Sequence, residues 1–214
     1  DLGGRLLEAN SWTGYGSNID ILAKAAPLAG HFNTTPDIDG VVRSLPLLAE
    51  YKGQYYESLA LAMFRRLAGS PNVVPGFSDE QWISRNYQGL DRILLKQGKS
   101  SLSISVDRHV STLVPYRGAG GVKGGSYRYV SAADVLAGRL PEGSLKDKII
   151  LVGTTAPGLL DLRVTPVGQV YPGVEAHANL ISAWLDDKVY LKPDYAMGYD
   201  VAVLIITGLL LAIG

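Results

Sequence analysis

The chain contains 214 residues, which is enough for one ordinary domain and at most a small appendage. Twenty basic side chains balance twenty acidic ones, so the formal net charge is zero and the sequence lacks the basic excess that nucleic-acid binding requires. The absence of cysteine excludes disulfides and thiolate chemistry.

The first half of the chain predicts a strand, a helix and a β-hairpin. A turn signal followed by apolar residues predicts a strand over 41–51. Residues 57–69 carry apolar side chains at helical spacing and end in a glycine that can serve as a C-cap, which predicts an amphipathic helix. Residues 102–114 alternate apolar and polar side chains on both sides of an Asp-Arg turn, so we expect two strands paired as a hairpin.

The second half predicts a loop, a short helix and a central strand. Glycines dominate residues 118–125 and predict a flexible loop. Ser131 and Asp134 have the spacing of a capping box and predict a short helix over 131–140. The continuous apolar run 148–153 predicts a central strand that is covered on both faces. The sequence therefore predicts an α/β fold in which a mixed β-sheet is flanked by helices.

A helix with two chemically different faces is predicted over 174–185. Its apolar face carries Val174, His177, Ala178, Ile181, Trp184 and Leu185. Glu175 and Asn179 lie on the opposite face, so Glu175 is not placed to contact His177. Because a lone histidine on a core face is more often a hydrogen-bonded core residue than a ligand, we expect His177 mainly to stabilise the fold, with Asp161 or Thr165 as its candidate partner.

The last residues of the chain predict the start of a transmembrane helix. Residues 201–214 contain no charged side chain and reach about 21 Å as a helix, whereas a bilayer core needs about 20 apolar residues. Pro193 discourages a continuous helix from the preceding element, so we expect the membrane segment to occupy 196–214 and to make few contacts with the domain. The alternative is a buried C-terminal helix of a soluble domain.

Common catalytic and metal-binding motifs are absent from the sequence. The Gly-Lys-Ser stretch at 98–100 lacks the glycine that a P-loop places five residues earlier, and the glycine cluster 118–125 lacks the third glycine of a dinucleotide-binding fingerprint. His31, His109 and His177 are far apart in sequence, and none belongs to a metal-binding motif. We therefore expect no catalytic residue, no metal site and no cofactor in this chain.

Five sequence blocks occur in order between about residues 30 and 190: GHFNTTPDIDGVVRSLPLL, VPYRG, VSAADVLAGRL, LKDKIILVGTTAPGLLDLRVTP and YPGVEAHANLISAWL. Together they resemble the second class of CHASE domains, which are extracytoplasmic sensor modules of bacterial adenylate or guanylate cyclases, histidine kinases and serine/threonine kinases. In that family, transmembrane helices and a cytoplasmic output domain follow the sensor. The family also has a further transmembrane helix and a βα portion upstream of the first block, so we expect this sequence to lack the N-terminal part of the domain.

The resemblance implies a sensory input domain over 1–195 and the start of a transmembrane helix over 196–214. It implies a receptor in the cell inner membrane, with the sensor domain in the periplasm and a nucleotide cyclase or a protein kinase as the output. The expected partners are the membrane and an unknown small-molecule or protein signal; a homodimer is compatible with this arrangement, and no nucleic acid is expected. The second interpretation is a membrane-anchored structural or dimerisation module without a small-molecule ligand, and a third is a solute-processing enzyme.

Seven polar residues in these blocks are the candidate ligand-binding residues: Asp37, Asp39, Arg43, Thr154, Asp161, Thr165 and His177. The first three surround a turn, where turn chemistry around Gly40 would also explain them. Thr154 and Asp161 follow the carboxyl end of the predicted central strand, where ligands of open α/β sheets tend to bind. Asp161 and Thr165 could instead stabilise their loop through hydrogen bonds to the backbone.

Overall fold

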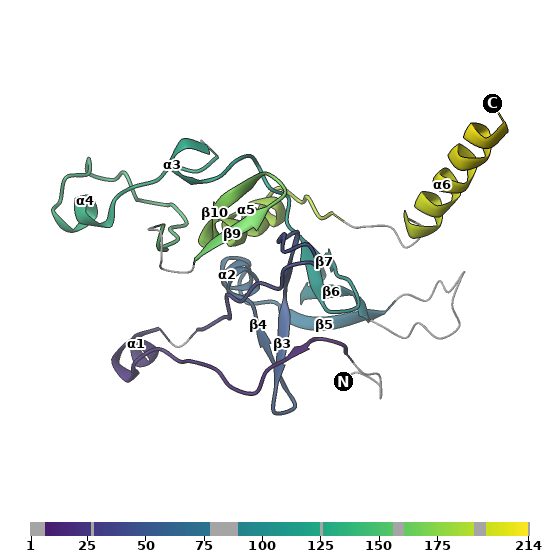
Figure 1. Ribbon diagram of the computed structural model, residues 1–214. Helices are drawn as coiled ribbons and strands as arrows, with labels where there is room; N and C mark the ends of the chain where they lie inside the picture. Colours follow the sequence, from purple (N-terminus) through teal and green to yellow (C-terminus); the bar gives the residue numbers. More distant parts are fainter. Residues whose placement is uncertain are drawn as a thin grey trace.

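The computed structural model of the chain describes residues 7–26, 28–77, 90–124, 126–155, 161–190 and 196–213 (Figure 1). The described residues have an α/β fold, as predicted, but their strands form several small sheets instead of one mixed sheet. The helices are α1 (Asp20–Ala25), α2 (Leu59–Leu67), α3 (Gly121–Gly124), α4 (Ala132–Leu136), α5 (Gly173–Leu185) and α6 (Ala196–Ile213). The strands are β1 (Asn10–Ser11), β2 (Ser44–Pro46), β3 (Leu48–Tyr51), β4 (Gln54–Glu57), β5 (Asn72–Phe77), β6 (Leu90–Gln97), β7 (Ser100–Ser105), β8 (Ser111–Leu113), β9 (Leu162–Thr165) and β10 (Gly168–Pro172).

The strand predicted over 41–51 is divided between two sheets. β2 pairs antiparallel with β8, whereas β3 pairs parallel with β1 and antiparallel with β4. The division falls at Leu47, whose N–H donates to the carbonyl of Val110 (2.8 Å) and whose carbonyl accepts from the N–H of Ser58 (2.8 Å). Because Leu47 takes its backbone partners from two different segments, the chain passes from one sheet to the other at this residue.

The hairpin predicted over 102–114 is wrong in its pairing. β7 pairs antiparallel with β6 across a tight turn that contains Gly98 at φ 58°, and β8 pairs with β2. Asp107 explains the difference, because its carboxylate accepts hydrogen bonds from the backbone N–H groups of His109 (2.9 Å) and Ser111 (2.8 Å). This local turn directs the chain away from β7 and towards a strand of another sheet.

The central strand predicted over 148–153 is also wrong. The segment has no regular secondary structure, and Ile149, Ile150 and Val152 are 42%, 50% and 87% exposed. An apolar run forms a strand only where neighbouring strands take up its backbone hydrogen bonds, and none of the described strands pairs with it. The segment instead lies against α5, where a Cβ atom on Gly153 would come within 2.7 Å of Val174.

Three predicted helices are confirmed, and local side chains explain where they begin. The Ser58 hydroxyl caps α2 by accepting a backbone N–H of its first turn (3.3 Å). The Ser131 hydroxyl caps α4 by accepting the N–H of Ala133 (3.2 Å), although Asp134 pairs with Arg139 instead of completing a capping box. α5 occupies the stretch where the two-faced helix was predicted.

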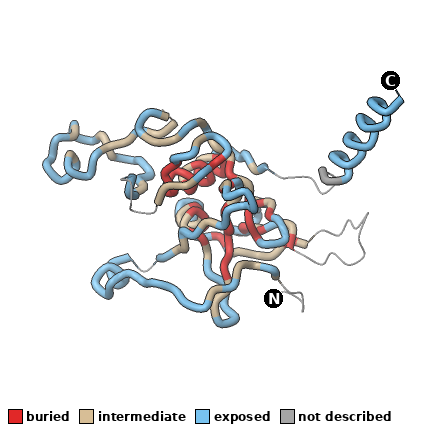
Figure 2. The backbone as a smooth tube through the Cα atoms, in the orientation of Figure 1, coloured by how far each residue is buried: buried red, intermediate tan, exposed pale blue. Residues whose placement is uncertain are grey.

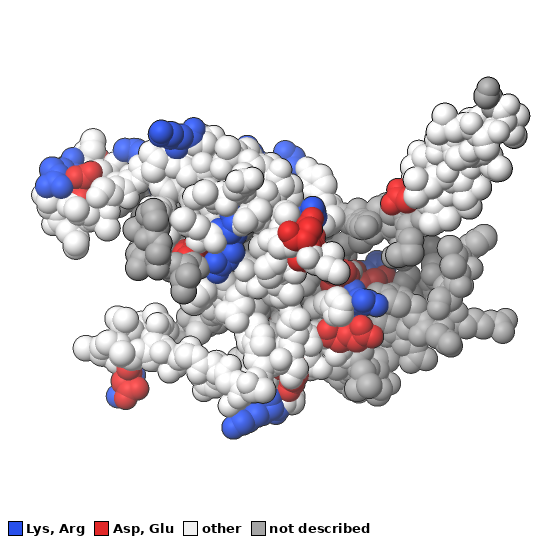
Figure 3. Space-filling view, in the orientation of Figure 1, with Lys and Arg blue, Asp and Glu red and all other residues white. Residues whose placement is uncertain are grey.

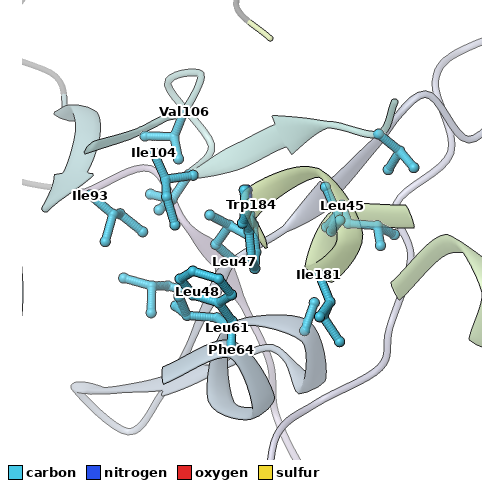
Figure 4. Close-up of a cluster of buried hydrophobic side chains, with 14 of the residues drawn as sticks. Leu45, Leu47, Leu48, Leu61, Phe64, Ile93, Ile104, Val106, Ile181 and Trp184 are labelled. Atoms are coloured by element: carbon cyan, nitrogen blue, oxygen red, sulfur yellow. The ribbon is translucent and has the colours of Figure 1, made fainter. Parts of the chain in front are cut away.

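The hydrophobic core lies where α2 and α5 pack together. Phe64 of α2 and Trp184 of α5 meet edge to face, with ring centroids 5.4 Å apart (Figure 4). Apolar side chains from the neighbouring strands complete the cluster, and they include Leu45, Leu47, Leu48, Ile93 and Ile104. Figure 2 shows the buried residues concentrated here, with α1, α4 and α6 exposed around the periphery. The contact between Phe64 and Trp184 therefore joins α2 to α5 within this core.

The C-terminal residues form α6, which stands away from the core (Figures 1 and 2). The prediction that this stretch is helical is confirmed, and the helix is exposed along residues 198–213. Among the described residues, no helix is both long enough and apolar enough to cross a membrane. The expected start of a transmembrane helix over 196–214 therefore stays a prediction.

Two neighbouring positions on α5 test the assignment of its buried face. Trp184 is buried, whereas Leu185, which the sequence placed on the apolar face, is 56% exposed. We expect Trp184→Ala to lower the free energy of unfolding by about 3–5 kcal/mol, because it leaves a cavity beside Phe64. Leu185→Ala should change it by less than about 0.5 kcal/mol. Chemical denaturation measures both values, and equal losses would contradict this orientation of α5.

Candidate functional site

The structure brings Asp37, Asp39 and Arg43 together in one turn. The Arg43 guanidinium donates to Asp37 (2.7 Å) and to both carboxylate oxygens of Asp39 (2.9 and 2.8 Å). The hydrogen bonds from Arg43, followed by one from the N–H of Val41, lower the pKa of Asp39 to about 2. Because these charges satisfy one another within the turn, the geometry favours turn chemistry over ligand binding for these three residues.

The strand β9 lies beside this turn. The N–H of Val42 donates to the carbonyl of Val164 (2.8 Å), and Nε of Arg163 donates to the hydroxyl of Thr34 (3.0 Å). Arg163 also faces the carboxylate of Asp161 at 4.0 Å. The fold thus places Asp161 close to the segment that carries the first three candidates, although more than a hundred residues separate them in sequence.

Thr154 and Thr165 have different surroundings. The buried Thr165 hydroxyl donates to the carbonyl of Gly168 (3.0 Å) and closes the turn between β9 and β10. Thr154 is exposed and follows Gly153, which packs on Val174 in the first turn of α5. Thr165 therefore stabilises a turn, whereas the Thr154 side chain is accessible to solvent.

His177 lies on the buried side of α5, near His31. Burial lowers the pKa of each imidazole to about 4. At His31 the charge of His177 lowers the pKa further. At His177 a hydrogen bond with the backbone of Phe32 acts in the opposite direction and raises the pKa. Nδ1 of His177 and both ring nitrogens of His31 are buried without a hydrogen-bond partner among the described residues. The expected partners Asp161 and Thr165 interact elsewhere. Both imidazoles are therefore neutral at neutral pH.

The opposite face of α5 is buried as well, which the sequence did not predict. Residues 115–124 and 126–130, which we together call the covering segment, lie across the side chains of Glu175 and Asn179. Three tyrosines hydrogen-bond to these two side chains: Tyr127, Tyr129 and Tyr171. The hydroxyl of Tyr129 donates to Glu175 at 2.7 Å, and Asn179 donates to the hydroxyl of Tyr171 at 2.6 Å. Burial, followed by the bond to Glu175, raises the pKa of Tyr129, so the phenol stays protonated as a donor.

A pocket of about 540 Å³ lies where the covering segment meets the end of α5. Its lining residues are Pro115, Tyr116, Arg117, Ala183, Asp186, Lys188 and Tyr190. Arg117 and Asp186 form an ion pair with 2.5 Å between Nη2 and Oδ2. The pocket thus combines one ion pair, one further cation and two aromatic side chains.

None of the seven residues predicted from the sequence lines this pocket. Arg117 stands in the block VPYRG, which offered a signal for it, but its partner Asp186 lies 69 residues later, just beyond the predicted helix. Such a pair is visible only after folding. In the described part of the chain, no group of three or more His, Cys, Asp or Glu side chains is arranged to hold a metal ion.

Comparison with known proteins identifies a family. The family model of the CHASE2 domain matches residues 5–214, which is nearly the whole chain. No curated protein and no solved structure matches it. The matched range includes both the turn around Asp39 and the pocket beside Arg117.

The buried histidines predict a loss of stability in acid. Their pKa is about 4 in the folded protein and about 6.5 in the unfolded chain, so protons bind the unfolded chain first as the pH falls. The free energy of unfolding should therefore decrease between about pH 6.5 and pH 4, by about 3 kcal/mol for His177, and these groups should add no further loss below pH 4.

Denaturation series across this pH range measure the effect. His177→Gln should reduce the dependence on pH, whereas His109→Gln, which replaces an exposed turn histidine, serves as the control and should leave it intact. A dependence that is the same in both variants would contradict the assignment to His177.

Proposed function

Since the chain belongs to the CHASE2 domain family, whose members are extracytoplasmic sensor domains, we propose that it is the sensory input domain of a membrane-bound bacterial signal-transduction receptor. The signal enters through the pocket beside Arg117. The output, a nucleotide cyclase or a protein kinase, is a separate domain of the receptor. The sensor domain lies outside the cytoplasm, and α6 attaches it to the membrane.

The position of the pocket is the observation that carries this proposal. One side of the pocket belongs to the covering segment, and the other side belongs to Ala183, Asp186, Lys188 and Tyr190. The last three residues lie in the stretch that follows α5 and leads along the chain to α6. A molecule in the pocket therefore contacts the connection between the core and the helix that we assign to the membrane. This is the position from which binding can change the direction or mobility of that helix.

The surface of α6 supports the membrane attachment. Large apolar side chains are exposed on all sides of the helix, including Leu204, Ile205, Leu210 and Leu211. In Figure 3 the helix carries charge at one end, where Asp200 lies. Exposed apolar surface of this extent is unfavourable in water and favourable in the hydrocarbon region of a bilayer.

The proposed topology can be tested by chemical labelling. Lys146 is exposed, so a Lys146→Cys substitution in the receptor gives a reactive site on the surface of the sensor domain. A membrane-impermeant maleimide should label this cysteine in intact cells whose outer membrane has been permeabilised. A permeant maleimide labels it in either topology and serves as the control. Labelling by the impermeant reagent only after lysis would contradict an extracytoplasmic sensor.

Membrane attachment by α6 can be tested with vesicles. The 214-residue chain should float with phosphatidylcholine vesicles, and the double variant Leu204→Lys/Leu211→Lys should bind them at least about tenfold less, because charged groups enter the bilayer at high cost. Leu136→Lys is the matched control, since Leu136 on α4 is 89% exposed and Leu211 is 85% exposed. If the control weakened flotation as much as the double variant, the apolar surface of α6 would not be the membrane contact.

A further inference from the structure

We propose that the pocket beside Arg117 binds a small organic carboxylate, and that the ligand carboxylate replaces Asp186 as the partner of the Arg117 guanidinium. This inference rests on the proposed sensory function and names the chemical class of the signal. Three features of the pocket carry it: its charge, the state of its ion pair and the nature of its walls.

The charge of the pocket favours an anion. Its lining carries two cations, Arg117 and Lys188, against one carboxylate, Asp186. The end of α5 would normally add negative potential through its free carbonyls. Here the backbone N–H groups of residues 186–188 donate to carbonyls of the last turn of α5, with distances of 2.7 to 3.2 Å. Because these carbonyls are already occupied, the side chains determine the local charge, which is positive.

The ion pair between Arg117 and Asp186 can be exchanged. Both side chains are partly exposed, at 39% and 45%, and ion pairs of this kind add little to stability. A guanidinium carries five N–H donors, and among the described residues the Arg117 side chain has Asp186 as its polar partner, through Nη2. A ligand carboxylate can therefore form two parallel hydrogen bonds to the same group, which one oxygen of Asp186 does not.

Lys188 gives the ligand an advantage over Asp186. Lys188 lines the same pocket, and within the described part of the chain its side chain forms no ion pair. A carboxylate held between Arg117 and Lys188 would face two cations at once. The exchange thus replaces one internal ion pair by a ligand with two cationic partners.

The walls of the pocket indicate that the carboxylate is attached to an apolar body. Tyr116, Tyr190, Pro115 and Ala183 supply aromatic and aliphatic surface. Tyr116 is held in place, because its hydroxyl donates to the carbonyl of Val42 (2.8 Å) and its ring meets Tyr171 edge to face at 5.0 Å. A rigid aromatic wall beside two cations suits an aromatic or branched carboxylate of small size.

Release of Asp186 has a structural consequence. Asp186 is the C-cap residue of α5, and its link to Arg117 ties the end of the helix to the covering segment. When the ligand carboxylate binds Arg117, the ion pair between Arg117 and Asp186 is broken. The covering segment then loses this link to the end of α5, from which the chain continues to α6. Binding of the carboxylate is thereby coupled to the connection between the core and α6.

Benzoate titrated into the 214-residue chain in detergent tests the proposal, with benzamide and benzylamine as the neutral and cationic analogues and inorganic phosphate as a plain anion. Isothermal calorimetry or the NMR shifts of the tyrosine rings report binding. We expect saturable benzoate binding with a Kd on the order of 1 mM and at least about tenfold weaker binding of the other three probes.

Three variants assign the binding to the pocket. Arg117→Gln should weaken benzoate binding at least about tenfold, and Lys188→Gln should weaken it about threefold. Asp186→Asn should strengthen it about threefold, because the competing carboxylate is gone. Arg139→Gln and Asp134→Asn are matched controls, since Asp134 of α4 and Arg139, which follows that helix, form a similar exposed ion pair outside the pocket lining. Both variants should leave the affinity unchanged.

Opposite results would overturn the proposal. Absence of saturable benzoate binding, tighter binding of benzylamine than of benzoate, or weaker benzoate binding in Asp186→Asn would each do so. If Arg117→Gln failed to fold, the stronger benzoate binding expected for Asp186→Asn would still test the proposal. The topology experiment with Lys146→Cys is independent of Arg117, so failure of benzoate binding alone would reject the carboxylate and leave the sensory role standing.

Discussion

Both faces of the helix α5 are buried, and the arrangement of the neighbouring segments depends on this double burial. On one side Trp184 packs on Phe64 of α2. On the other side Glu175 is buried to 3% exposure, and a buried carboxylate is costly unless hydrogen bonds replace its water. Tyr129 and the N–H of Gly121 in α3 both donate to Oε2 of Glu175, whereas its Oε1 is buried without a hydrogen-bond partner among the described residues. The covering segment therefore supplies the hydrogen bonds that Oε2 of Glu175 receives and contributes one to Asn179.

The pocket follows from this arrangement. Once the covering segment is fixed over Glu175 and Asn179, its first residues reach the end of α5, and Tyr116 and Arg117 come to face Asp186. Because the chain belongs to the CHASE2 family of sensor domains, this pocket is a candidate site for the signal. We propose that the signal is read at the junction between the covering segment, the end of α5 and the stretch that leads to α6. The hydrogen bonds between the covering segment and α5 would then keep the pocket next to that junction.

The helices α2, α4 and α5 could be predicted from the sequence because their signals are local, whereas α3 lies in the stretch 118–125 that was predicted to be a flexible loop. Ser58 and Ser131 cap helices within their own first turns, and the spacing of apolar residues defines α2 and α5 without reference to any other segment. The strands could not be paired correctly in the same way. Asp107 turns the chain away from β7, and Leu47 divides its partners between two segments, so the pairing depends on residues that are distant in sequence. The apolar run 148–153 shows the same limit, because composition alone does not supply a neighbouring strand.

The sequence by itself determined the family resemblance, the α/β class, three helices and the helical C-terminal stretch. It also determined the close grouping of Asp37, Asp39 and Arg43, since only six positions separate Asp37 from Arg43. It also placed His177 on the apolar face of its helix, where the structure has it. The tertiary structure decided that Glu175 and Asn179 are buried, that His31 lies near His177, and that Arg117 meets Asp186 across 69 residues of sequence. The physical reason is one of range: caps and helical periodicity act within a few residues, whereas burial of a polar face and the partners of a guanidinium depend on which segments the fold brings alongside.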